Sequence, residues 1–166
     1  MTQQHPGTSL GSHSGSDDAI NGIEEHIAQD WDILSRSLGL FVQPVLTEFA
    51  EHSSHIKALL FCTSDGLNVC TLGVRDNDVG RLSALTSSVF SVAAAHRKVM
   101  DDRGMDNATV QISSGDDHTV LVAVRLPGLG NFVLGAYAEG IQLGLLLVQL
   151  RQTATRIHER LSADRR

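Results

Sequence analysis

Residues 56–72 read Ile-Lys-Ala-Leu-Leu-Phe-Cys-Thr-Ser-Asp-Gly-Leu-Asn-Val-Cys-Thr-Leu, and this stretch decides the fold. Two apolar runs of strand length flank a turn that contains Asp65-Gly66. They predict a β-hairpin, because an Asp-Gly pair between two such runs suits a tight turn. The first run is apolar almost throughout, so we expect it to be covered on both faces.

The hairpin carries both cysteines of the chain. A two-residue turn would pair Cys62 with Val69 and Phe61 with Cys70, which places the two sulfurs on opposite faces. A loop one residue longer or shorter would change that register, so a disulfide stays open. The pattern favours two buried thiols that act as small core hydrophobes.

Upstream of the hairpin, apolar residues recur every three or four positions and form one stripe: Ile20, Ile23, Ile27, Trp31, Leu34 and Leu38. The stripe predicts a helix over 18–38, which Gly39 would close. A second helix is predicted through Val42, Val45, Leu46 and Phe49. Pro44 would lie in its first turn, where proline is tolerated.

Downstream, residues 79–100 predict a long amphipathic helix whose packing stripe consists of Leu82, Leu85, Val89, Ala93 and Met100. The period then switches to two, which predicts strands over 108–113, 119–126 and 131–138. A last helix is predicted over 141–161. Five strands with helices on both faces predict an α/β protein, a three-layer α/β/α sandwich.

The organisation along the chain follows from these elements. The Gly/Ser-rich residues 1–17 predict a disordered tail, because they cannot bury enough apolar surface to offset their ordering entropy. We expect an extra N-terminal helix over 18–38, the main domain over 39–162 and a disordered C-terminus over 163–166.

Composition excludes several classes of protein. Thirteen basic and 19 acidic residues among 166 give a formal net charge of −6, which disfavours a nucleic-acid binder or a protein held on anionic lipid. No run approaches the roughly 18 uninterrupted apolar residues of a membrane span. The N-terminus lacks the features of a signal peptide. We therefore expect a cytoplasmic protein that is not inserted in a membrane.

Motifs for chemistry are absent from the sequence. It contains no P-loop and no G-x-S-x-G elbow, and Gly128-Leu129-Gly130 lies between two predicted strands rather than before a helix. Glu48, His52 and His55 could form a weak metal-binding cluster, but a solvated helix end is favoured. We expect no catalytic residue, no cofactor and no metal site.

The long helix also has a second face, formed by Val79, Ser83, Ser87, Phe90, Ala94 and Arg97. Phe90 could simply widen the core face, or this face could contact a second copy of the chain. The strand over 108–113 favours the second interpretation, because it has no proline, lysine or bulge signal to block pairing at a sheet edge. The predicted dimer interface consists of Ser83, Ser87, Phe90, Ala94, Arg97, Thr109 and Gln111.

From about Leu46 to Leu161 the chain resembles the Roadblock/LC7 domain family. The resemblance lies in the 58–67 hairpin, Asp76 and Asp78 in the following loop, and three further segments: Leu82-Ser83-Ala84-Leu85, Thr109-Val110-Gln111-Ile112 and Gly140-Ile141-Gln142-Leu143-Gly144. It implies a profilin-like sheet ordered 2-1-5-4-3 and a homodimer joined through the third strand and the long helix. The Trp31-containing helix and the tail depart from the family's pattern.

The resemblance also implies a function. Family members act as adaptors or regulators of small Ras-like GTPases, as dynein light chains or as scaffolds, and the family has no catalytic residues to transfer. We therefore expect a non-enzymatic homodimeric regulator or adaptor whose partner is a small Ras-like GTPase or a related signalling complex. The alternatives are a small-molecule-sensing α/β/α domain and a purely structural scaffold subunit.

Overall fold

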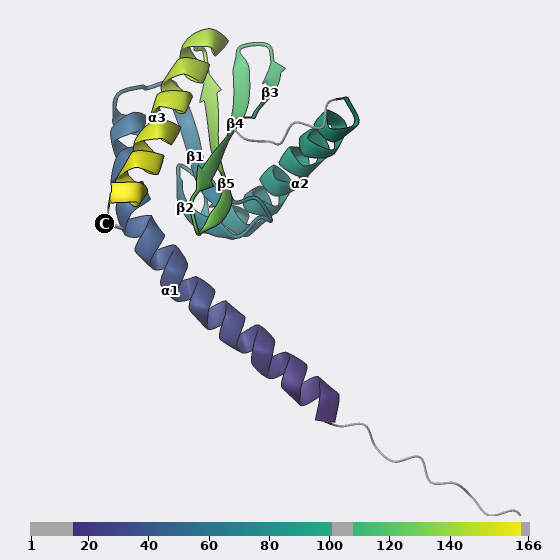
Figure 1. Ribbon diagram of the computed structural model, residues 1–166. Coiled ribbons are helices and arrows are strands. Elements are labelled where there is room, and N and C mark those ends of the chain that lie inside the picture. Colours follow the sequence, from purple (N-terminus) through teal and green to yellow (C-terminus); the bar gives the residue numbers. More distant parts are fainter. Residues whose placement is uncertain (1–14, 101–107, 164–166) are drawn as a thin grey trace, which may run out of the picture. The chain divides into compact units, whose positions relative to one another are not determined.

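The computed structural model describes residues 15–100 and 108–163, with side chains from Asp30 onward. The elements in chain order are α1 (Gly15–Glu51), β1 (Ile56–Thr63), β2 (Asn68–Leu72), α2 (Asp76–Met100), β3 (Thr109–Ser114), β4 (Asp117–Leu126), β5 (Gly130–Glu139) and α3 (Leu143–Ala163) (Figure 1). Helix α1 begins within the stretch predicted as a tail. The predicted disorder of 1–14 and 164–166 lies outside the described residues.

The sheet has the order β2-β1-β5-β4-β3 and every neighbouring pair is antiparallel, which confirms the predicted strand order. Helix α2 packs on one face, where Phe90 joins Leu60 and Val133 in a buried cluster. Helix α3 packs along β4 on the opposite face. The aliphatic character of β1, β4 and β5 follows from this cover on both sides.

The chain divides into two compact units at Leu34–Ser35, four residues before the predicted end of the extra helix. In the first unit, the structure describes residues 15–34, all of which are helical. The second unit contains residues 35–51 of α1, the whole sheet, α2 and α3.

Helix α1 is continuous from Gly15 to Glu51, so the predicted break at Gly39 and the placement of Pro44 in a first turn are both wrong. An interior glycine costs a helix about 1 kcal/mol and an interior proline about 3 kcal/mol relative to alanine. The packing of five buried side chains in this part of α1 outweighs these local costs: Leu38, Val42, Val45, Leu46 and Phe49. Pro44 itself lies on the exposed side of the helix.

The hairpin register matches one predicted pair and not the other. Phe61 lies opposite Cys70 as predicted, but Cys62 lies opposite Asn68, because an irregularity between Phe61 and Cys62 leaves Val69 as an extra residue. The predicted Cys62–Val69 pair is therefore wrong. Both thiols are free and buried, so the disulfide that the register left open does not form.

Candidate interaction surface

The inner face of α2 holds this helix on the sheet. Its buried residues are Ser83, Thr86, Ser87 and Phe90. Ser87 Oγ donates a hydrogen bond of 2.7 Å to the carbonyl oxygen of Ser64 in the hairpin turn. A Cβ placed on Gly66 would lie 3.2 Å from the Cβ of Ser87. The turn and the helix can therefore pack this closely because Gly66 has no side chain and that of Ser87 is small.

This packing corrects the predicted faces of α2. Leu85 and Met100 belong to the stripe that we expected against the sheet, but they are 53% and 74% exposed. Ser83, Ser87 and Phe90 were expected on an outer face, yet they are at most 9% exposed. The small residues do permit a close approach, as expected, but the element that approaches is the chain's own hairpin. Phe90 widens the core, which was the other interpretation of this face.

The outer face of α2 is apolar, and sequence reasoning missed it as a surface. We define it as Leu85, Val92, Val99 and Met100, which are 53%, 70%, 86% and 74% exposed. The first three follow one another at seven-residue spacing, the signal that could have revealed them. This spacing is typical of helices that pack side by side.

Strand β3 lies at one end of the described sheet and pairs with β4 without a register shift. The backbone amide of Ala123 donates a 2.9 Å hydrogen bond to the carbonyl oxygen of Ala108, so residues 108 and 123 form a hydrogen-bonded pair. Along an antiparallel ladder, hydrogen-bonded pairs alternate with pairs that are not hydrogen-bonded. Residues 110, 112 and 114 therefore bond to β4. Thr109, Gln111 and Ser113 turn their backbone N–H and C=O groups toward the outer edge, where the described part of the chain places no further strand.

The other edge strand, β2, is a poorer template for pairing. It has five residues, and the irregularity at Val69 interrupts its ladder with β1. Helix α1 also approaches it, because a Cβ on Gly39 would lie 3.7 Å from the Val69 carbonyl oxygen. Bulges and covering helices are common ways of blocking an edge, so β3 is the edge that can accept another strand.

The two faces of β3 differ in character. Val110 and Ile112 lie on the α2 side, opposite Leu121 and Thr119 of β4, and Ile112 is 50% exposed. Thr109 and Gln111 lie on the α3 side, where Arg151 donates a 3.2 Å hydrogen bond to Thr109 Oγ1. The predicted interface residues on β3 thus project from the sheet face opposite to that of Phe90.

The remaining predicted interface residues, Ala94 and Arg97, are half-buried on α2, and Gln111 is exposed.

No protein-family model and no curated protein matches the sequence. Three solved structures resemble it over most of its length. Myxococcus xanthus MglB has a TM-score of 0.63 and 14% identity, covering 75% of this chain and 90% of its own. The Roadblock/LC7 domain of Streptomyces avermitilis has a TM-score of 0.57 and 18% identity, covering 70% and 93%. An MglB with a tetrameric arrangement has a TM-score of 0.59 and 12% identity, covering 74% and 88%.

The chain has the Roadblock/LC7 fold. The structural similarity covers 70–75% of this chain and 88–93% of each of the three solved structures. At these identities the likeness is one of fold. Among the residues that the structure describes, no helix has the length and apolar character to cross a bilayer.

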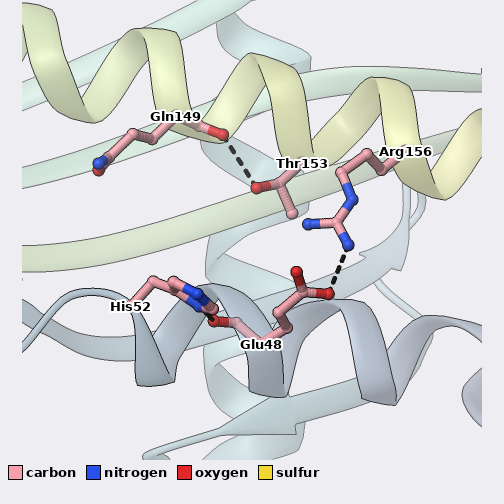
Figure 2. Close-up of polar contacts among 5 residues, drawn as sticks. All are labelled: Glu48, His52, Gln149, Thr153 and Arg156. Carbon is pink, nitrogen blue, oxygen red and sulfur yellow. Dashed lines mark hydrogen bonds and ion pairs between the residues drawn. The ribbon is translucent and has the colours of Figure 1, made fainter.

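Glu48 links α1 to α3 through an ion pair with Arg156 (Figure 2). Its carboxylate accepts a hydrogen bond from Arg156 of α3, which holds the pKa of Glu48 below its ordinary value. His52 Nδ1 donates to the Glu48 carbonyl (2.6 Å), and His55 Nδ1 donates to the Glu139 carbonyl (3.0 Å). In the described ranges no three potential ligands come together.

Proposed function

We propose that this chain is a non-enzymatic regulator or adaptor that works as a homodimer and binds a small Ras-like GTPase or a related signalling complex. One observation carries the proposal: the regular, open edge of β3 lies in the same unit as the exposed apolar outer face of α2. The resemblance to Roadblock/LC7 proteins supports it, since that family joins its subunits through these two elements.

The β3 edge is self-complementary. If two copies pair antiparallel about a two-fold axis through Gln111, Thr109 lies opposite Ser113 of the partner subunit. In this register every outward N–H and C=O group from residue 109 to residue 113 finds a partner. Val110 then lies opposite Ile112 of the partner subunit and covers that exposed side chain.

Helix α2 supplies the apolar part of the proposed interface. The same axis makes the two α2 helices antiparallel, and the seven-residue spacing of Leu85, Val92 and Val99 suits such a pair. Half-buried Ala94 and Arg97 lie on the same side of α2 as Phe90, about half a turn away from this contact. Ser83, Ser87 and Phe90 contribute from inside, by fixing the rotation of α2 on the sheet.

The dimer is tested by the molar mass of the full chain in solution, measured by light scattering. We expect the wild type to have twice the mass of the chain and Val92→Glu to have the mass of one chain. Leu145→Glu is the matched control, because Leu145 is also an exposed apolar residue (50%) but belongs to α3 and not to α2. A wild type with the mass of one chain would overturn the homodimer.

The partner is tested by binding of the wild-type chain to small Ras-like GTPases loaded with GDP or with a non-hydrolysable GTP analogue. Stronger binding to one nucleotide state supports a regulator, because a ligand shifts an equilibrium only through differential affinity. Equal binding to both states supports an adaptor. An absence of binding to any of the GTPases would overturn this part of the proposal while leaving the dimer intact.

A further inference from the structure

A groove of about 600 Å³ lies between α3 and β4, on the sheet face opposite to α2. Figure 1 shows α3 running along this part of the sheet. Val122, Val124 and Ala154 line the groove with apolar surface, Arg125 contributes its backbone carbonyl, and Arg151 and His158 contribute basic side chains. Among the described residues that line it, none carries a carboxylate, although the protein as a whole has a net charge of −6.

Two of the basic side chains have hydrogen bonds but no counter-charge. Arg151 donates to Thr109 Oγ1 over 3.2 Å, and His158 Nδ1 lies 2.9 Å from the Arg125 carbonyl oxygen. No carboxylate in the described part of the chain lies within ion-pair distance of either one. A carbonyl only accepts hydrogen bonds, so His158 Nδ1 carries the proton of this contact, and Nε2 donates to an anion when the ring carries a proton on both nitrogens.

The spacing on α3 gathers these donors on one side of the helix. Arg151, Thr155 and His158 are separated by four and three residues, so they lie above one another along α3. A guanidinium presents parallel N–H groups that match the oxygens of phosphate, and an imidazole N–H adds a single hydrogen bond. The Thr155 hydroxyl donates to the Arg151 carbonyl (3.1 Å) and must turn away from it to bind a phosphate oxygen. The volume of the groove lies in the range typical of small-molecule sites and exceeds that of a free phosphate ion.

We propose that this groove binds a phosphorylated small molecule, with its phosphate held by Arg151, Thr155 and His158 and its remaining part on Val122, Val124 and Ala154. The site belongs to a single subunit and does not depend on the proposed dimer. It gives a physical basis to the sensing function that the sequence left as an alternative. A phosphorylated side chain of a partner protein could present the same chemistry, and a phosphoserine peptide tests for that source.

The test is an NMR titration of the full chain with inorganic phosphate and pyrophosphate, with sodium chloride at matched ionic strength as the blank. We expect saturable shifts at the backbone amides of Arg151, Thr155 and His158. Arg151→Gln should weaken binding about tenfold, the loss expected for one charge-assisted hydrogen-bond pair. Arg160→Gln is the matched control, because Arg160 lies on the same helix but outside the groove.

His158→Gln provides a second variant and should also weaken the binding of phosphate. A phosphoserine heptapeptide and glycerol phosphate then separate the two sources. Tighter binding of glycerol phosphate supports the small molecule, whereas binding of the peptide alone would overturn it in favour of a partner's side chain. Shifts that do not saturate, or that Arg151→Gln and Arg160→Gln reduce equally, would overturn the site.

Discussion

Ser87 Oγ lies 2.7 Å from the carbonyl oxygen of Ser64, to which it donates a hydrogen bond. This bond joins the middle of α2 to the turn of the β1–β2 hairpin and fixes which side of the helix faces the sheet. Because Ser87 and Phe90 point inward, Val92 points outward with 70% of its surface exposed. The rotation of one helix therefore decides which apolar surface remains for a partner.

Replacing Ser87 by alanine should destabilise the fold. The substitution leaves the Ser64 carbonyl without this partner, and such a loss costs about 1–2 kcal/mol. Ser88→Ala is the matched control, because Ser88 is exposed and donates only to the carbonyl of Ala84 within its own helix. Urea unfolding of the two variants should show a lower stability for Ser87→Ala alone. Equal stabilities would show that the Ser87–Ser64 bond does not fix α2.

The two sides of α2 should also respond differently to truncation. Phe90→Ala removes a ring that is 6% exposed in the cluster with Leu60 and Val133, so we expect a loss of about 3–5 kcal/mol. Val92→Ala should change the free energy of unfolding by less than about 0.5 kcal/mol, as is usual at the surface. Urea unfolding at a concentration where the chain is monomeric measures both. A larger loss for Val92→Ala would reverse the assignment of faces.

The register of the proposed dimer can be tested by crosslinking. Pairing about Gln111 places its Cα about 5.5 Å from the same atom of the partner subunit, within the range that a disulfide spans. Gln111→Cys should therefore form a covalent dimer under mild oxidation, as seen by non-reducing electrophoresis. Ile112→Cys is the control, because two copies of residue 112 would lie about 7–8 Å apart on the diagonal.

Crosslinking distinguishes the register from the dimer itself. A dimer in light scattering that Ile112→Cys traps better than Gln111→Cys would place the two-fold axis elsewhere along β3. The native thiols should not interfere with the assay. Burial raises the pKa of Cys62 and of Cys70 to about 12, so both remain protonated thiols near neutral pH.

Thiol labelling checks this expectation. Burial is the largest cause of both pKa shifts, with the charge of Asp65 adding to the shift of Cys62. A coloured disulfide reagent should therefore leave the native chain unlabelled at pH 8 and label two thiols per chain in denaturant. Labelling of the native chain at the rate of a free thiol would contradict the burial of the hairpin thiols.

The β1–β2 hairpin and the open β3 edge could be anticipated because their signals are local, whereas the strand order came only from the resemblance to the Roadblock/LC7 family. Asp65-Gly66 specifies the hairpin turn, and alternation along β3 specifies a strand with two different faces. The same locality explains the error at α1. Gly39 and Pro44 are unfavourable in any isolated helix, but the packing of Val42, Val45 and Leu46 outweighs that cost only in the folded chain.

The faces of α2 and the basic groove depend on contacts that periodicity does not encode. Ser64 and Ser87 are 23 residues apart, and Thr109 and Arg151 are 42 residues apart. A helix with apolar residues on more than one side has two plausible inner faces in sequence alone. The choice between them needed the position of the Gly66 turn, which belongs to another element.

The Glu48–Arg156 ion pair should make stability depend on pH. The hydrogen bond from Arg156 lowers the pKa of Glu48 in the folded chain from its ordinary value of 4.5. A lowered pKa means that the folded state favours the carboxylate, so the stabilisation is present above pH 4.5 and is lost as the pH falls through the folded value. Glu48→Gln should therefore lower Tm at neutral pH, and the difference from the wild type should shrink toward about pH 3.

Glu51→Gln is the matched control for this measurement. Glu51 lies three residues further along α1, is exposed, and has no ion pair within the described ranges. Its Tm difference from the wild type should be small and should vary little between the two pH values. Both side chains of the Glu48–Arg156 pair are 47% exposed, so added salt should also reduce the effect of Glu48→Gln. A Tm difference for Glu48→Gln that stays constant with pH would show that the variant acts by altered packing between α1 and α3.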